Sequence, residues 1–103
     1  MIHLTEADFR QMPWKNGKGV TIEMLKIERP GFYLRLSRAM VTEDGAFSLF
    51  PGIERNLTVL SGPGFDLTGI GPARPLVPLA FPGDIPTSAT GVTAPCEDFN
   101  VMT

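Results

Sequence analysis

The sequence contains one cysteine and one histidine in 103 residues, and this scarcity excludes several kinds of chemistry. Cys96 forms no disulfide within the chain and no thiolate metal cluster, so we interpret it as a small apolar filler. Imidazole-based metal sites need more than His3, which we expect to be a solvated terminal residue. A Ser-His or Cys-His nucleophile also lacks a positioned base. We therefore predict no metal ion, no cofactor and no catalytic residue.

Long hydrophobic runs and clustered positive charge are missing as well. No apolar stretch approaches the roughly 20 residues of a spanning helix, and the N-terminus lacks the basic and apolar regions of a signal peptide. We therefore expect no membrane partner and a cytoplasmic location. The formal net charge is −2 and the nine basic residues are scattered, so nucleic acid is not an expected partner.

The hydrophobic content, the length and the glycine and proline content of the chain indicate one small β domain. A hydrophobic share of 43% with 19% charged residues is typical of a globular chain. The length favours a single domain spanning residues 1–103. Eleven glycines and ten prolines interrupt the chain every few positions, which favours short strands joined by turns over long helices. The fold class predicted is all-β.

Local patterns place the strands. A short helical turn capped by Thr5 is expected within residues 1–12. Alternating or β-branched segments bounded by Gly and Pro turns then predict about seven or eight short antiparallel strands, at 19–27, 32–41, 45–50, 55–61, 65–70, 79–81, 87–92 and 97–103. Such spacing fits a small barrel or a jelly-roll sandwich. The last strand reaches Thr103 with no turn behind it, which predicts an open edge and a homodimer through edge strands.

Three polar side chains form the main candidate site. Arg35 and Ser37 alternate onto one face of segment 32–41, and Arg55 opens a later strand, so all three can point into a barrel mouth. A guanidinium fork pairs with a carboxylate through two parallel hydrogen bonds, and a hydroxyl donates or accepts beside it. The predicted ligand is a small carboxylic acid. The alternative is that the arginines face solvent or make structural ion pairs, with Glu54, Asp84 or Asp98.

Two further groups are secondary candidates. Trp14 could cover apolar surface while Lys15 and Asn16 supply donors at the rim of the pocket, although a tryptophan beside a proline also suits core packing. Asp98 and Asn100 share one face of the last predicted strand, which allows paired polar contacts in the pocket or an outward orientation.

Several blocks of sequence resemble a known family. The hairpin NLTVLSGPGFDLT, followed by LAFPGDIPTSA, resembles the cupin pattern of two strands and a later Gly-Asp turn. The order and spacing of four blocks, MPWKNGKGVT at 12–21, LRLS at 34–37, DGAFSLFPGIER at 44–55 and DFNVM at 98–102, look like the HutD/Ves family of cupins. One departure is Gly17-Lys18-Gly19, where the family usually has three consecutive glycines, and Lys18 is expected to alter this loop.

The resemblance implies a bicupin-type fold, of which this chain corresponds to the N-terminal part, because members are commonly close to twice its length. It also implies a link to histidine utilisation or stress response, with no established catalytic activity.

Our first hypothesis is therefore a non-enzymatic protein that senses or sequesters a small carboxylate, such as an intermediate of histidine breakdown, through Arg35, Arg55 and residues 14–16. A metal-free cupin isomerase or lyase, in which a lysine or carboxylate moves a proton, is the second. The third is a dimeric assembly module without a ligand.

Overall fold

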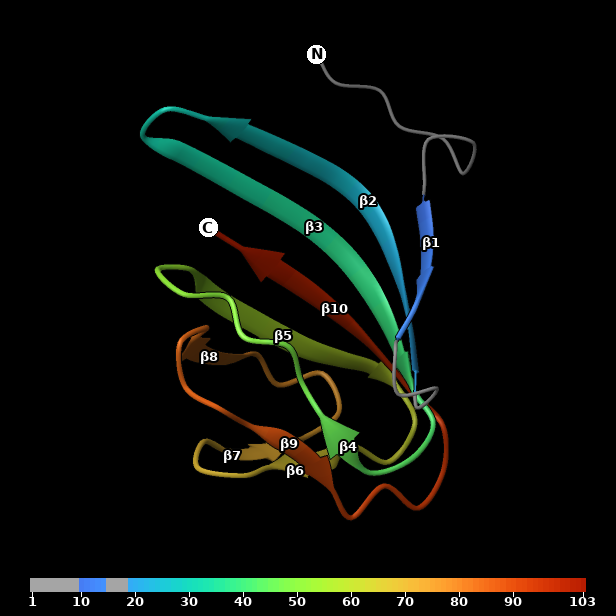
Figure 1. The fold of residues 1–103 in the computed structure, drawn as a ribbon. Coiled ribbons are helices and arrows are strands. Elements are labelled where there is room, and N and C mark those ends of the chain that lie inside the picture. Colours follow the sequence, from blue (N-terminus) through green and yellow to red (C-terminus); the bar gives the residue numbers. More distant parts are fainter. Residues whose placement is uncertain (1–9, 15–18) are drawn as a thin grey trace.

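The computed structural model describes residues 10–14 and 19–103, and these residues form strands and turns with no helix (Figure 1). Accordingly, the described part contains no helix that could cross a membrane. The ten strands are β1 (Arg10–Pro13), β2 (Gly19–Arg29), β3 (Phe32–Val41), β4 (Gly45–Ala46), β5 (Glu54–Ser61), β6 (Phe65–Leu67), β7 (Gly71–Ala73), β8 (Leu79–Pro82), β9 (Ser88–Thr90) and β10 (Cys96–Met102).

The strands form two antiparallel sheets. The larger has six strands in the order β1-β2-β3-β10-β5-β8, and the smaller has four in the order β4-β9-β6-β7. The two sheets are separate ladders within the described residues, so the architecture is an open jelly-roll sandwich rather than a closed barrel. The prediction of an all-β fold of this type is confirmed.

Most predicted strands are present, with local corrections. Segment 32–41 is a strand over the whole predicted range, whereas 45–50 is a strand only at its first two residues. The expected helical turn in 1–12 is wrong for residues 10–12, which pair with β2; its remainder lies outside the described residues. Residues 71–73, which lie between the predicted strands 65–70 and 79–81, form β7 because Gly71–Ala73 pairs with β6.

The position of the last strand contradicts the open edge that the sequence suggested. β10 lies in the middle of the six-stranded sheet, paired with β3 on one side and β5 on the other. Its backbone donors and acceptors are therefore used inside the sheet, and β10 offers no edge to a partner.

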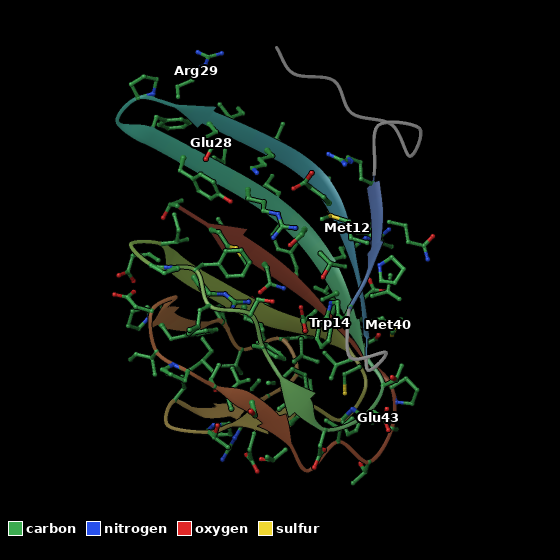
Figure 2. The ribbon with its side chains drawn as sticks, in the orientation of Figure 1. Met12, Trp14, Glu28, Arg29, Met40 and Glu43 are labelled. Atoms are coloured by element: carbon green, nitrogen blue, oxygen red, sulfur yellow. The ribbon has the colours of Figure 1, made fainter. Side chains whose placement is uncertain are left out.

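The hydrophobic core lies between the two sheets at one end of the sandwich (Figure 2). The six-stranded sheet contributes inward residues of β3, β5 and β10, and the small sheet closes over them; the buried cluster is Val41, Leu57, Val59, Phe65, Leu67, Ala73, Phe81, Ala89 and Cys96. Cys96 is buried and free, as its interpretation as an apolar filler requires.

Gly62 sets the close approach between the end of β5 and the start of β10. Its φ is +92°, and a Cβ atom there would lie 2.6 Å from the carbonyl oxygen of Pro95 and 2.8 Å from the Cα atom of Cys96. Gly69 has a similar φ of +78° with no atom within 4 Å of its Cβ position, so it is a matched control.

We predict that Gly69→Ala lowers the free energy of unfolding by about 1–2 kcal/mol, the cost of a left-handed alanine. Gly62→Ala should cost a further ~1–3 kcal/mol, because the clash adds to the same backbone strain. Urea unfolding of both variants measures the difference. Equal losses would show that the β5–β10 junction tolerates a methyl group.

Candidate functional site

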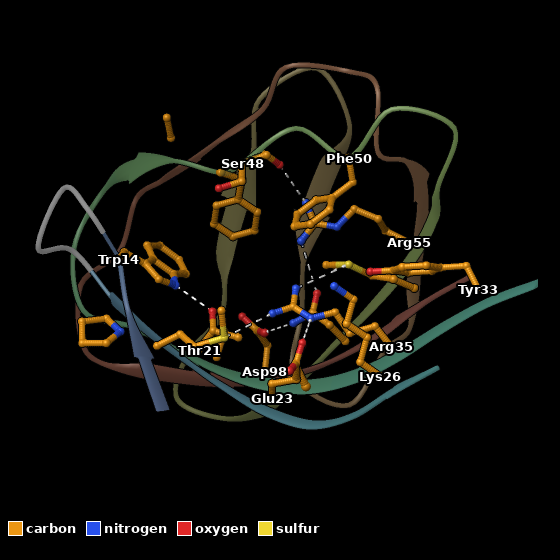
Figure 3. Close-up of a pocket in the computed structure, with 18 residues that line it drawn as sticks. Trp14, Thr21, Glu23, Lys26, Tyr33, Arg35, Ser48, Phe50, Arg55 and Asp98 are labelled. Atoms are coloured by element: carbon orange, nitrogen blue, oxygen red, sulfur yellow. Dashed lines mark hydrogen bonds and ion pairs between the residues drawn. The ribbon is translucent and has the colours of Figure 1, made fainter. Parts of the chain in front are cut away.

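A pocket of about 590 Å³ opens on the inner face of the six-stranded sheet, beside the core (Figure 3). Strands β3, β10 and β5 form its polar floor. Residues 46–50 form the opposite wall and residues 12–14 close one end. Pockets of this size are common for small-molecule ligands.

The register of the three central strands places the polar groups together. Ser37 on β3 lies opposite Asn100 on β10, and Met102 of β10 lies between Arg35 of β3 and Arg55 of β5. Because paired residues point to the same side of a sheet, all five side chains face the pocket. The prediction that Arg35, Ser37 and Arg55 point inward is thus correct as to their location.

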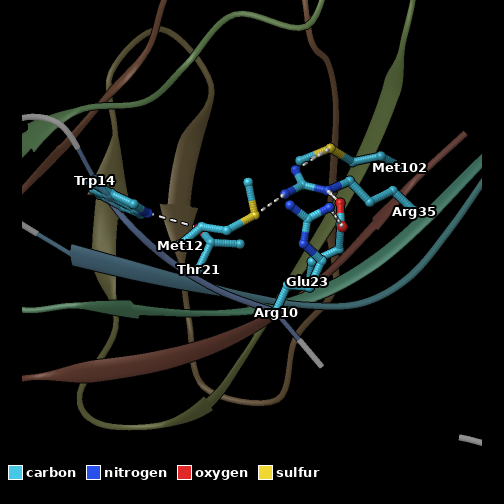
Figure 4. Close-up of polar contacts among 7 residues, drawn as sticks. All are labelled: Arg10, Met12, Trp14, Thr21, Glu23, Arg35 and Met102. Carbon is cyan, nitrogen blue, oxygen red and sulfur yellow. Dashed lines mark hydrogen bonds and ion pairs between the residues drawn. The ribbon is translucent and has the colours of Figure 1, made fainter. Parts of the chain in front are cut away.

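Arg35 already has a charged partner. Its Nε donates to Oε1 of Glu23 on the neighbouring strand β2 over 2.9 Å, and both residues are 8% exposed (Figure 4). The two terminal nitrogens of Arg35 contact the sulfur atoms of Met102 and Met12, at 4.0 and 3.8 Å. A buried ion pair of this kind fixes the guanidinium in place.

The expected ion-pair alternative is therefore realised for Arg35, but with a partner that the sequence did not suggest. Glu23 comes from β2, whereas the carboxylates considered were Glu54, Asp84 and Asp98. A register shift between Glu23 and Leu25 keeps Lys26 on the same inner face, at the exposed rim beside Arg35.

Arg55, in contrast, is buried with few partners. It is 7% exposed, its two hydrogen bonds, to the Ser48 carbonyl and to Oδ1 of Asn100, are both 3.5 Å long, and its Nε has no hydrogen-bond partner among the described residues. Its Cζ atom lies 5.0 to 5.5 Å from the centres of three aromatic rings, those of Phe81, Phe50 and Phe47. Burial lowers the pKa of Arg55 to about 10, an effect that the charge of Asp98 opposes. Aromatic faces offset only part of such a desolvation cost.

Asp98 is the second incompletely partnered group. Its side chain is fully buried; Oδ1 accepts a hydrogen bond of 2.5 Å from Nδ2 of Asn100, while Oδ2 has no partner among the described residues. Burial raises the pKa of Asp98 to about 7, against the opposing effects of the Asn100 hydrogen bond and the positive charge of Arg55. The carboxyl group therefore changes its charge near neutral pH.

Trp14 joins the pocket to the core. Its ring meets that of Phe47 edge to face at 5.6 Å between centres, and its Nε1 donates to Oγ1 of Thr21 over 2.8 Å. A Cβ atom at Gly19 would lie 2.8 Å from the Trp14 ring, so glycine is required where β2 begins. Trp14 thus packs on the core and lines the pocket at once, which unites the two interpretations of its sequence context.

The opposite wall is held by its backbone. The Phe47 amide donates to the Thr87 carbonyl over 3.0 Å, and the Phe50 amide donates to the Gly83 carbonyl over 2.8 Å. These bonds replace the ladder expected for 45–50, and they direct both phenylalanine rings toward Arg55.

The structure brings six predicted site residues to this pocket: Trp14, Arg35, Ser37, Arg55, Asp98 and Asn100. Lys15, Asn16, Lys18 and His3 lie outside the described residues. No cluster of three metal-ligating side chains occurs within residues 10–14 and 19–103. The ligand-binding roles of the six residues remain predictions.

Sequence reasoning missed Glu23 and the aromatic wall. The alternation of Thr21 and Glu23 in β2 matches that of Arg35 and Ser37 in β3, which was an available signal. The sequence offers no such signal for the aromatic wall, because Phe47 and Phe50 are three residues apart in a segment that alternates like a strand.

The family is established by comparison with known proteins. The HutD family model matches residues 6–103. The chain belongs to the HutD family. It is 41% identical to an uncharacterised 21.2 kDa protein from the hutC 3' region of Pseudomonas putida, over 96% of this chain and 56% of that protein. It is also 36% identical to the protein Ves of Citrobacter koseri, over 93% of this chain and 56% of that protein. This HutD-family chain thus spans about half the length of the curated relatives it matches.

Solved structures agree with this assignment. The structure of HutD from Pseudomonas fluorescens SBW25 in a formate condition superposes on this chain with a TM-score of 0.82 at 40% identity. The match covers 93% of this chain and 56% of that one. A cupin domain of a transcriptional regulator from Enterobacter cloacae superposes with a TM-score of 0.66 at 13% identity, over 82% and 95% of the two chains. The latter likeness shows the cupin fold alone.

Asp98 makes stability depend on pH. Because its pKa is raised in the folded state, the folded protein retains a proton that the unfolded chain has lost between about pH 4 and pH 7. Stability should therefore fall as pH rises through this window, by up to about 1.4 kcal/mol per pH unit from this group, and then level off.

We predict that Asp98→Asn removes this contribution. The free energy of unfolding of the variant should therefore rise relative to that of the wild type as pH rises from 4 to 7. Thermal unfolding of both proteins across this range measures the difference. Parallel pH profiles would show that Asp98 is ionised normally in the folded protein.

Proposed function

We propose that this HutD-family protein binds a small carboxylic acid, with Arg55 as the anchor of the carboxylate. The observation that supports this most is a buried guanidinium that faces a pocket and lacks a close partner. Leaving a buried charge unpaired costs several kcal/mol, and an anionic ligand removes that cost. Arg35, held by Glu23, supplies positive charge nearby without being the anchor.

The charge of the pocket supports an anion. The carboxylate of Glu23 faces two arginines, Arg35 and the exposed Arg10, and Asp98 is largely uncharged below pH 7. The groups at the pocket therefore carry a net positive charge, to which Arg55 and the rim residue Lys26 contribute. The rest of the lining combines neutral polar side chains such as Ser37 and Asn100 with aromatic rings, those of Trp14, Phe47 and Phe50. The ligand proposed is a carboxylic acid with a short unsaturated or aliphatic body. Its carboxylate faces Arg55 and its body contacts the aromatic rings.

The biological setting belongs to the same proposal. A relative is named for the hutC 3' region and a solved structure for HutD, and the family resemblance suggests histidine utilisation. We therefore propose that the ligand is an acidic intermediate of histidine breakdown, which the protein senses or sequesters. Urocanate, formylglutamate, glutamate and formate form the test panel.

We predict that one or two related acids raise the unfolding midpoint by on the order of ten degrees at 100 times the dissociation constant, which corresponds to about 2.7 kcal/mol. Arg55→Ala should abolish the shift, and Arg55→Lys should weaken it because a point charge replaces the fork. Arg74→Ala, which alters an exposed arginine outside the pocket, is the control that keeps the full shift. A flat panel, or an undiminished shift in Arg55→Ala, would refute the assignment.

A metal-free isomerase or lyase is a second candidate function, and Asp98 favours it. A buried carboxyl group with a pKa near 7 in a pocket has the properties of a general base or acid. In this candidate, its carboxylate takes a proton from a carbon next to a substrate carbonyl and returns one to the same or another position. Arg55 would stabilise the negative charge that develops on the substrate oxygen.

We predict for this candidate that the acid selected by the thermal panel exchanges a carbon-bound proton for deuterium when incubated with the protein in D₂O, as followed by proton NMR. Asp98→Asn should stop the exchange while it retains the thermal shift. Binding without exchange would leave a binding protein as the function.

A further inference from the structure

Asp98 and Arg55 contact the same amide group in the floor of the pocket. Oδ1 of Asn100 accepts a hydrogen bond of 3.5 Å from Nη2 of Arg55, and Nδ2 of Asn100 donates one of 2.5 Å to Oδ1 of Asp98. Both charged groups belong to the pocket lining (Figure 3). A carboxylate bound at Arg55 therefore lies in the same small pocket as the carboxyl group of Asp98.

The negative charge of Asp98 has little compensation within the protein. The side chain is fully buried, and Oδ2 has no hydrogen-bond partner among the described residues. The Coulomb energy between two charges is large in such a poorly solvated site, so an unsatisfied carboxylate there is sensitive to any further charge. The carboxylate of a ligand is a further charge of the same sign.

Two carboxylates that share one buried site do not both stay ionised. The group with the higher pKa takes up a proton, as in any closely spaced pair of acids. Burial raises the pKa of Asp98 to about 7, whereas small carboxylic acids resemble aspartic and glutamic acid, with pKa values near 4. Asp98, rather than the ligand, therefore takes up the proton.

The other charged or titratable groups around the pocket leave this assignment intact. The residues at 12–14 and at 46–50 are MPW and AFSLF, which contain no titratable side chain. The strands contribute the remaining groups of the lining: Glu23 and Lys26 on β2, Tyr33 and Arg35 on β3, and Arg55 on β5. Arg10 on β1 contacts Glu23 from the exposed side. Burial is the largest influence on the pKa of Asp98, ahead of the Asn100 hydrogen bond and the Arg55 charge, which lower it, and the Glu97 charge, which raises it.

We infer that a small carboxylic acid binds this pocket together with a proton, which Asp98 takes up. The inference rests on the proposed function, because it requires the anion at Arg55, and it adds that pH controls the affinity of the site. The ligand binds most tightly when Asp98 is already protonated. Its affinity falls as pH rises above about 7, until the pH reaches the higher pKa that Asp98 has in the complex.

The test counts the protons taken up on binding. The protein is titrated calorimetrically, at pH 6.5 and at pH 8, with the acid of the panel that raises the unfolding midpoint most. Each titration is run in phosphate and in Tris, whose different ionisation enthalpies convert the proton uptake into a difference in heat. The wild type should take up about a quarter of a proton or less at pH 6.5 and more than about half a proton at pH 8. Its affinity should weaken by roughly five- to tenfold between these two values.

Asp98→Asn is the decisive variant, because it resembles the protonated carboxyl group in shape and keeps an acceptor for Asn100. It should bind with the wild-type pH 6.5 affinity at both pH values and take up no proton. Asp66→Asn, which alters an exposed aspartate outside the pocket, is the matched control and should behave as the wild type. Formate and formylglutamate carry only carboxyl groups that stay ionised in this range. For glutamate and urocanate, Asp98→Asn also measures the proton of the ligand itself.

The proton count of the wild type does not depend on a variant, so the test holds even if Asp98→Asn fails to fold. An acid that binds with the same affinity at both pH values and without proton uptake overturns the inference. The proposed function then stands if Arg55→Ala still loses binding. Proton release on binding, or equal uptake in the wild type and a folded Asp98→Asn variant, also overturns the inference. Binding by no acid of the panel refutes both the inference and the proposed function.

Discussion

The incomplete pairing of a buried cation is the constraint from which the rest of this site follows. Arg55 lies among phenylalanine rings, and the carboxyl group whose charge acts on it, that of Asp98, is itself too buried to ionise readily. The charge of each group favours the charged form of the other, yet burial disfavours both charged forms, and Asp98 Oδ2 accepts no hydrogen bond from Arg55. The two arginines of the pocket therefore differ: Arg35 belongs to an ion pair with Glu23, whereas Arg55 has two hydrogen bonds of 3.5 Å and an Nε without a partner among the described residues.

The polar floor of the pocket also bears on which residues lie on the outer side of the six-stranded sheet. The floor of the pocket is made of Arg35, Ser37, Asp98 and Asn100, and the core begins directly beside it, because Val59 and Leu57 on β5 pair with Asp98 and Asn100 on β10. Alternation along β3 and β10, and along β2 on either side of its register shift, then places other apolar residues of these strands, such as Leu36 and Val101, outside. The same two-residue period thus places polar side chains in the pocket and apolar side chains on the outer side of β3 and β10.

Much of this arrangement was readable in the sequence. The alternation in 32–41 predicts which residues share a face with Arg35, and the turns predict most strands, because these are local signals. The strand order is not local, which is why β10 was expected at an edge and Glu23 was missed as the partner of Arg35. The wall at Phe47 and Phe50 also escaped prediction, since its geometry depends on backbone bonds to Thr87 and Gly83, more than 30 residues away.

The most direct test of Arg55 as the anchor is the NMR signal of its Nε–H group, assigned by its loss in Arg55→Lys and followed while a carboxylic acid from the panel is added. If Arg55 binds the carboxylate, this signal should move downfield and saturate, and the methyl ester of the same acid should leave it unchanged, because the ester lacks the charge that pairs with the guanidinium. If the acid binds with the Arg55 signal unmoved, or if acid and ester move it equally, the buried guanidinium is not the anchor.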